Sequence, residues 1–229
     1  MRPIGVGSVL WFVSMLLCSL AVAAGFAWSL DPFARSLPLG EVFLFLATCL
    51  LFMGVSIFLY RVFLRFFPVP VGEIPDGSRQ EFYYFVYLLH WLVLFAPLTR
   101  ATFIPAPFSR LIMIALGARV GPGSYSSGVV MDSQFVTVGS NSLIGLDVAI
   151  LPHALEGSRA AHYPIVIGSG VTIGARALIM AGVEIGDGAV VAMNSVVTKH
   201  TRIGPNEVWG GIPARCLSKL DATGRPARP

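Results

Sequence analysis

Two histidines in the second half of the chain are, by side-chain type, the best suited to move protons. His153 and His162 stand nine positions apart, in a segment free of long apolar runs. Because an imidazole has a pKa of about 6.5, it can take the proton of a hydroxyl while that oxygen attacks an acyl carbon. We therefore consider both histidines candidate general bases, and the residues alone leave open which of the two acts.

Polar side chains near these histidines are candidates for orienting an imidazole or contacting a substrate. Glu156 ends the segment HALE, which His153 begins, so its carboxylate is a candidate for orienting either imidazole. Asp132 takes a place where the repeat described next expects an aliphatic residue, so it is either a break in the pattern or a polar substrate contact. With Asn141 it forms the predicted substrate-binding pair. No metal site is predicted, because the three cysteines lack metal-ligand spacing.

A period of six residues governs the second half of the chain from Ile114 onward. Counting by six from Ile167, all seven positions up to residue 203 are Ile or Val. The upstream half follows the rule in another frame, with five of seven positions aliphatic, and Asp132 is one of the exceptions. This period is typical of a left-handed parallel β-helix, whose aliphatic side chains fill a three-sided core. We expect the eleven residues from Glu156 to Val166, which separate the two frames, to be extruded as a loop.

The register of the repeat also sorts the two histidines. His153 takes the fourth place of its hexad, where other hexads have Gly, Asn or Asp. Such residues form turns, so His153 is predicted to face outward, just before the extruded loop. His162 lies inside that loop, immediately before the repeat resumes.

The first half of the chain has the composition of a membrane domain. The mean hydropathy is +0.75 and only 12% of residues are charged, whereas soluble domains have roughly 25%. Two charge-free stretches are long enough to cross about 30 Å of hydrocarbon. We predict transmembrane helices at about 4–30 and 42–60, followed by interfacial or re-entrant helices at about 82–99 and 103–116. The predicted fold is therefore mixed, with these helices preceding the β-helix.

The distribution of arginines predicts the orientation of the membrane domain. Arg61, Arg65 and Arg79 follow the second apolar stretch, whereas only Arg35 lies between the first two. The positive-inside rule then places residues 61–81 and the β-helix on the cytoplasmic side of the inner (cytoplasmic) membrane. The predicted parts are a membrane domain, a β-helix and a flexible tail, at residues 1–113, 114–217 and 218–229.

The repeats, with VIGSGVTIGARALIMAGVEIGDGAVVAMNSVVTK and the closing WGGIPAR, resemble the hexapeptide-repeat acyltransferases over about residues 114–217. This resemblance implies a homotrimer that uses acetyl-CoA as acyl donor, with active sites between neighbouring β-helices. It also implies a set of coenzyme A contacts, in which small residues admit the pantetheine arm and two basic residues meet the phosphates. These contacts are Ala175, Ala181, Ala192, Met193, Thr198, Lys199 and Arg215.

The sequence therefore predicts a membrane-anchored O-acetyltransferase with histidine as general base. Its partners would be membrane lipids, a glycan or lipid-linked sugar as acceptor, and a polymer synthase. An alternative is a non-catalytic trimeric scaffold or accessory subunit of a polysaccharide or peptide-polymer assembly. A γ-class carbonic anhydrase would need three histidines on zinc, and only His153 and His162 lie close together. Nucleic-acid binding is excluded, because the basic residues are spread thinly despite a net charge of +4.

Overall fold

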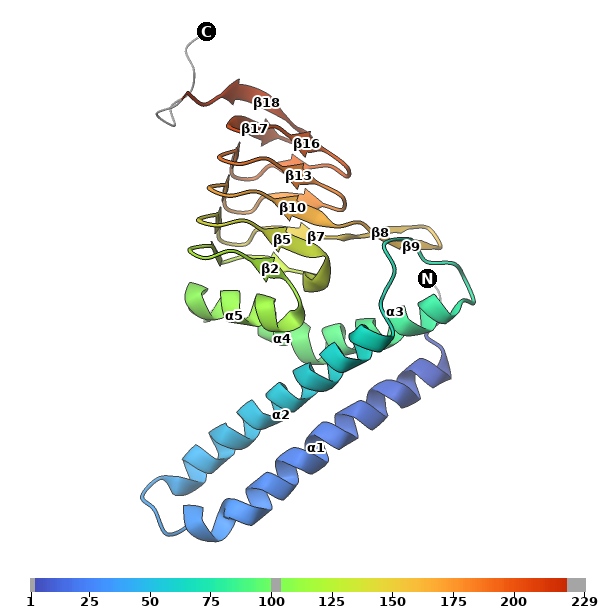
Figure 1. Ribbon diagram of the computed structural model, residues 1–229, viewed down its shortest axis with the longest axis vertical. Coiled ribbons are helices and arrows are strands. Elements are labelled where there is room, and N and C mark those ends of the chain that lie inside the picture. Colours follow the sequence, from blue (N-terminus) through green and yellow to red (C-terminus); the bar gives the residue numbers. More distant parts are fainter. Residues whose placement is uncertain (1–2, 100–103, 222–229) are drawn as a thin grey trace. The chain divides into compact units, whose positions relative to one another are not determined.

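The computed structural model describes residues 3–99 and 104–221, which form two compact units (Figure 1). The helical unit contains residues 3–69 and 75–92. Among the described residues, the repeat unit contains 70–74, 93–99 and 104–221. The chain therefore leaves the helical unit for a short segment, 70–74, and returns to it before it enters the rest of the repeat unit.

Long apolar helices make up the helical unit and continue into the start of the repeat unit. Helices α1 (Val6–Ala34) and α2 (Gly40–Phe66) correspond to the two predicted transmembrane helices. Helix α1 extends beyond its predicted C-terminal end, and α2 extends beyond both of its predicted ends. Helix α3 (Arg79–His90) runs through a π-helical turn (Trp91–Phe95) into α4 (Ala96–Thr99). By length and composition alone, α1, α2 and the segment Arg79–Thr99 could each cross a membrane.

Short strands in the repeat unit stack into three parallel ladders, the three faces of a β-helix (Figure 1). Sheet one contains β2 (Arg119–Val120), β5 (Val136–Val138), β10 (Ile165–Ile167), β13 (Glu184–Ile185) and β16 (Arg202–Ile203). Sheet two contains β3 (Tyr125–Ser126), β6 (Leu143–Ile144), β11 (Thr172–Ile173), β14 (Val190–Val191), β17 (Glu207–Gly211) and the antiparallel β18 (Ala214–Lys219). Sheet three contains β4 (Val129–Val130), β7 (Ala149–Leu151), β12 (Leu178–Met180) and β15 (Val196–Val197).

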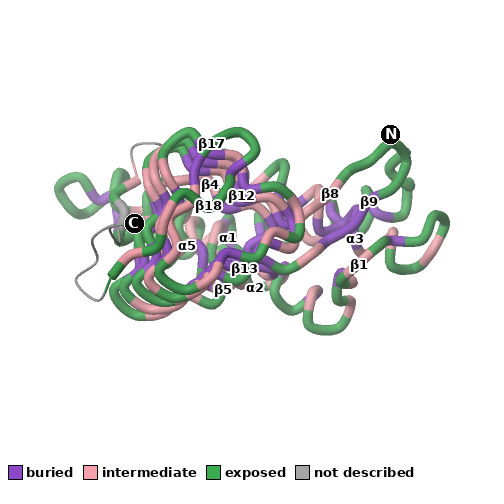
Figure 2. Tube along the Cα trace, turned by 90° about the horizontal axis from the view of Figure 1, so that it is seen from above, coloured by how far each residue is buried: buried purple, intermediate pink, exposed green. Residues whose placement is uncertain are grey.

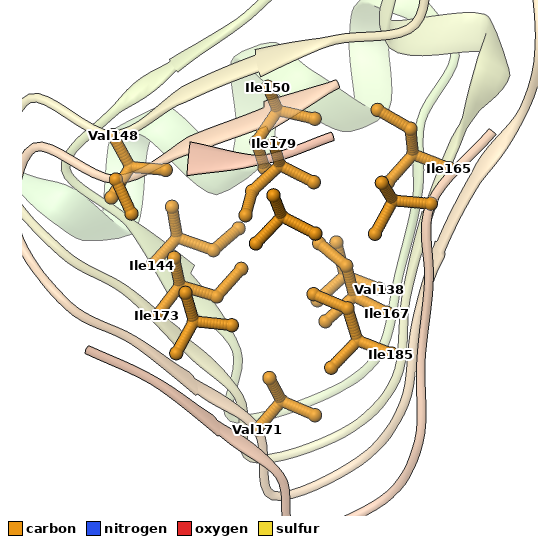
Figure 3. Close-up of a cluster of buried hydrophobic side chains, with 14 of the residues drawn as sticks. Val138, Ile144, Val148, Ile150, Ile165, Ile167, Val171, Ile173, Ile179 and Ile185 are labelled. Atoms are coloured by element: carbon orange, nitrogen blue, oxygen red, sulfur yellow. The ribbon is translucent and has the colours of Figure 1, made fainter. Parts of the chain in front are cut away.

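The aliphatic positions of the hexads form the core, as predicted. Side chains from the three sheets, such as Ile150, Ile144 and Ile167, point into one interior (Figure 3). The register explains the pattern, because Ile167 pairs with Ile185 eighteen positions later, which is one full coil. Gly182 and Asn194 have positive φ angles of 74° and 56°, which these residue types tolerate at a turn.

Both predicted ends of the β-helix differ from the structure. Ile114, taken as the first hexad position, lies in helix α5 (Ala106–Leu116), so the β-helix begins at Arg119. Asp132 marks a break in the repeat, which was one of its two interpretations, because Val130 pairs with Ile150 and a 3-10 turn (Ser133–Phe135) follows. Ser218 and Lys219, assigned to the flexible tail, belong to β18, whereas residues 222–229 lie outside the described residues.

Candidate active site

The two candidate histidines face each other on a β-hairpin. The excursion from the β-helix is a hairpin of β8 (His153–Glu156) and β9 (Arg159–His162), in which His153 is the direct cross-strand partner of His162. It begins three residues before the predicted loop, residues 156–166, whose last two residues belong to β10 instead. Gly157 supplies the positive φ of 62° that the tight turn requires. The hairpin leaves the β-helix where the chain passes from sheet three to sheet one. We call this edge the hairpin corner and define it as residues 131–135, 152–164, 181–183 and 198–201.

Asp132 holds the imidazole of His153 from the preceding coil of the same corner. Its Oδ2 atom lies 2.5 Å from Nδ1 of His153. Asp132 is buried and has a left-handed backbone with φ 48°, which Asp adopts more readily than most residues. The hydrogen bond and the charge of Asp132 raise the pKa of His153 above its ordinary value, against the opposing effect of burial. The side chain of His153 is 23% exposed and so remains accessible.

His162 is enclosed where His153 is accessible. Its side chain is 1% exposed and stacks on the ring of Phe135, with centroids 4.8 Å apart and planes at 20°. Burial lowers the pKa of His162 to about 4, with the neighbouring His153 acting in the same direction and Asp132 opposing it. His162 is therefore neutral at pH 7 and packs beneath the carboxylate, 3.9 Å from Nε2 to Oδ1 of Asp132.

This arrangement favours His153 as the base and Asp132 as its partner. When Nδ1–H of His153 donates to Asp132, the tautomer is fixed and Nε2 becomes the proton acceptor. Glu156, the candidate for orienting an imidazole, forms an ion pair with Lys199. Sequence reasoning singled out Asp132 as a break in the repeat and a candidate substrate contact, but did not connect it with His153. The signal was present, because an Asp at an irregular hexad is suited to a left-handed turn.

The predicted coenzyme A contacts fall on two different edges of the β-helix. Ala181, Thr198 and Lys199 belong to the hairpin corner, where the backbone N–H of His200 donates to the carbonyl of Ala181. The others lie where the chain passes from sheet two to sheet three, which we call the second corner (residues 174–177 and 192–195). There the N–H of Asn194 donates to the carbonyl of Ala175. This second group consists of Ala175, Ala192 and Met193, with Arg215 beside them on β18.

Asn141 is separated from Asp132, its predicted partner in substrate binding. It is exposed, has φ 55°, and lies between β5 and β6, at the corner joining sheets one and two. Across residues 3–99 and 104–221, no group of three or more His, Cys, Asp and Glu side chains is placed to hold a metal ion.

Comparison with known proteins identifies the repeat. The family model described as the hexapeptide repeat of succinyl-transferase matches residues 164–199. The galactoside O-acetyltransferase of Escherichia coli (strain K12) is 35% identical over 99 residues, 40% of this chain and 48% of that protein. The mitochondrial gamma carbonic anhydrase 2 of Arabidopsis thaliana is 32% identical over 100 residues, 42% of this chain and 36% of that protein. A hexapeptide-repeat acetyltransferase of Vibrio cholerae, solved with acetyl-CoA, is 34% identical with a TM-score of 0.42, covering 46% of this chain and 61% of that one.

The similarity to these relatives covers only part of each protein. The chain spans about half the length, 48% and 50%, of two curated acetyltransferase relatives. The same repeat occurs in acetyltransferases and in carbonic anhydrases, so the repeat by itself does not fix the reaction. The galactoside O-acetyltransferase, a putative acetyltransferase of Bacillus subtilis (strain 168) and the chloramphenicol acetyltransferase of Morganella morganii are among these relatives, so the repeat region is similar to that of acetyltransferases.

Proposed function

We propose that the chain is a membrane-anchored O-acetyltransferase that moves an acetyl group from acetyl-CoA to a hydroxyl of a glycan or lipid-linked sugar. The observation that carries this proposal is the His153–Asp132 pair, which lies at the foot of the hairpin with its imidazole accessible and its carboxylate buried. The similarity to a galactoside O-acetyltransferase supports a hydroxyl acceptor on a sugar.

The pair can perform acyl transfer in two proton steps. Nε2 of His153 takes the proton of the acceptor hydroxyl as that oxygen forms a bond to the thioester carbon of the donor. The imidazolium that results is stabilised by Asp132, whose Oδ2 accepts the Nδ1–H bond. When the carbon–sulfur bond breaks, the imidazolium returns the proton to the departing thiolate, so the enzyme ends in its starting state.

Coenzyme A fits the residues at both corners. Lys199 and Arg215 offer positive charge for phosphate groups, and Ala175, Ala181 and Ala192 leave room for a narrow arm along the edge. The two groups of candidate contacts lie on different edges of one β-helix, so a site that uses both needs two β-helices side by side. This division supports the homotrimer that the resemblance to the hexapeptide-repeat acyltransferases implies. The left-handed winding of the coils remains part of the proposal, on the six-residue period.

If the protein is anchored in a membrane, its acceptor is expected to lie at the membrane surface. Helices α1 and α2 are long and apolar enough to cross, and their most apolar windows are only 17% and 6% buried. Side chains so exposed are suited to lipid contact. We place the repeat unit on the cytoplasmic side of the inner membrane, where acetyl-CoA is made, and expect a lipid-linked glycan and the associated polymer synthase as partners.

The test uses the full chain in lipid nanodiscs with labelled acetyl-CoA and lipid-linked glycans as acceptors. Replacing His153 by Gln should lower kcat by roughly 10²–10⁴-fold, the usual contribution of a general base. His162→Gln should lower kcat less than about tenfold, since that side chain is 1% exposed and its pKa of about 4 makes it a weak base. Glu184→Gln, an exposed carboxylate on β13, is the matched control and should leave kcat unchanged.

Other outcomes would point elsewhere. Full activity in His153→Gln, with loss of activity in His162→Gln, would make His162 the base and exclude His153 from that role. Stable binding to a synthase without affinity for coenzyme A would favour the scaffold. Stoichiometric zinc with carbon dioxide hydration and no transfer would favour an anhydrase.

A further inference from the structure

The linker between α2 and α3 supplies a third strand to the catalytic hairpin. Strand β1 (Gly72–Glu73) pairs antiparallel with β9, so that Gly72 lies opposite His162 and Glu73 opposite Ala161. Figure 2 labels β1, β8 and β9 in the same part of the trace. The N–H of Ile74 donates to the carbonyl of Ala160 over 2.9 Å. The side chain of Ile74 is 1% exposed, so this strand is packed as well as hydrogen-bonded.

This pairing places a constraint on the path of the chain through a membrane. Residues joined by a backbone ladder lie on the same side of a bilayer, because the hydrocarbon layer is about 30 Å thick. Between β1 and the described start of the β-helix, the structure contains one helix long enough to cross, Arg79–Thr99. A single crossing there would put Gly72 and His162 on opposite faces. The strand pairing of β1 with β9, in which Gly72 lies opposite His162, is incompatible with that arrangement.

We propose that Arg79–Thr99 does not span the bilayer, and that this segment and helix α5 each contact the lipid leaflet on the side of the hairpin that carries both histidines. The proposal rests on the membrane anchoring proposed above and is independent of the reaction. It gives the chain two crossings, by α1 and α2, and a monotopic segment that enters and leaves by one face.

The segment Arg79–Thr99 differs from the two other long helices in the way this proposal requires. Its most apolar window is 44% buried within the protein, against 17% for α1 and 6% for α2. A π-helical turn interrupts it at Trp91–Phe95, and such turns arise where a helix departs from regular geometry. Leu92 and Val93 are nevertheless about half exposed, which leaves an apolar surface for lipid.

Helix α5 has the character of an interfacial helix. Phe108 and Leu111 are 58% and 57% exposed, whereas Met113 and Leu116 are buried against the repeat unit. The guanidinium of Arg110 donates to the carbonyl of Val120, which ties the helix to the first coil. An eleven-residue helix is too short to cross a bilayer, and an apolar outer face suits it to lie in the interface.

Exposed arginines flank β1 in the sequence, which is consistent with anionic lipid headgroups on the side of the hairpin. Arg61 and Arg65 lie at the end of α2, Arg79 begins α3, and all three are exposed. They flank β1 in the sequence, so the strand and its hairpin share the face that attracts anionic headgroups.

The experiment measures the sidedness of cysteines in the full chain, in sealed vesicles of both orientations. Cys18 and Cys49, which lie in α1 and α2, are replaced by Ala. The probes are native Cys216 on β18, Val71→Cys in a Cys216→Ser background, and Leu37→Cys in the same background; all three positions are exposed. A membrane-impermeant maleimide should label Cys216 and the Val71→Cys probe at least roughly tenfold faster from one face, and the Leu37→Cys probe from the other.

The result that overturns the proposal is labelling of the Val71→Cys probe and of Cys216 from opposite faces, which requires a crossing by Arg79–Thr99. Labelling of the Leu37→Cys probe from the same face as the other two would also overturn it, because α1 and α2 would then not cross. Acetyl transfer plays no part in this readout, so failure of the proposed reaction leaves the topological result intact.

Discussion

In the proposed mechanism, the carboxylate of Asp132 sets the pH range in which His153 would act as a base. Because the pKa of His153 is raised, its imidazole is charged at low pH, and kcat/KM should rise with pH and level off above that pKa. Asp132→Asn removes the charge, and Asn tolerates the left-handed backbone. We expect the rising limb to move to lower pH and the plateau to fall by roughly 100-fold or more, as measured by the pH dependence of kcat/KM.

The control for this change is Glu184→Gln, which removes an exposed carboxylate that pairs with Arg202 on the outer face. In this variant, the rising limb of the pH profile of kcat/KM should stay at the same pH. The rising limb of the pH profile cannot come from His162, because the pKa of that residue is about 4 and it is already deprotonated in this pH range. An unshifted limb in Asp132→Asn would mean that another group sets the pKa of the base.

At this scale the sequence predicted the histidines but not their partners. The hexad register places His153 outside the core, and that is confirmed by its partial exposure. His153 lies opposite His162 because of the register of the β8–β9 hairpin. That register cannot be predicted from the six-residue period, since the hairpin lies outside the repeat. Likewise, the Glu156–Lys199 ion pair joins residues two coils apart, and only the folded corner brings them together.

At the scale of the elements, strand β1 should stiffen the hairpin that carries both histidines. Gly72 has φ 93°, a conformation that a residue with a side chain avoids, so Gly72→Val should detach β1 from β9. We expect faster amide exchange at Arg159–His162 and a kcat lower by roughly 10- to 100-fold, with KM for acetyl-CoA unchanged, because misplacing a base affects the chemical step. Hydrogen exchange and steady-state kinetics on the full chain check this.

Gly77→Val provides the comparison. Gly77 lies in the same linker with a positive φ of 66° and open space around it, but outside strand β1. It should strain the backbone without touching the hairpin. Equal losses in both variants, or detachment of β1 without any change in kcat, would show that β1 has no positioning role.

The fold was largely predictable because the repeat is a local rule applied many times. From Ile167 onward, the aliphatic positions are buried as the period requires. The rule failed where the spacing slips, between Ser126 and Val138, since Val130 enters the core two positions early. The residues gained there form the turn that brings Phe135 onto His162. The irregular coil is thus the one that builds the site, and a period cannot anticipate it.

The path of the whole chain links anchoring to chemistry. It leaves the end of α2, adds one strand to the catalytic hairpin, and continues through an apolar segment before the coils begin. Five residues, 67–71, separate the end of α2 from Gly72, the partner of His162. Fully extended, this stretch reaches about 20 Å. Under the proposed anchoring by α2, the candidate base would lie within about that distance of the bilayer surface, and an acceptor held by a lipid would meet it without a long glycan.

The orientation of the whole molecule can be tested with its own donor. Acetyl-CoA carries several charges and does not cross a bilayer, so donor added outside sealed vesicles reaches only an outward-facing site. If the repeat unit is cytoplasmic, inverted vesicles should acetylate their endogenous lipid-linked glycans at once. Right-side-out vesicles should do so only after permeabilisation, with a rise of at least roughly tenfold. The reverse latency would place the His153–Asp132 pair on the face without acetyl-CoA, and an acetyl-CoA-dependent role would then be untenable.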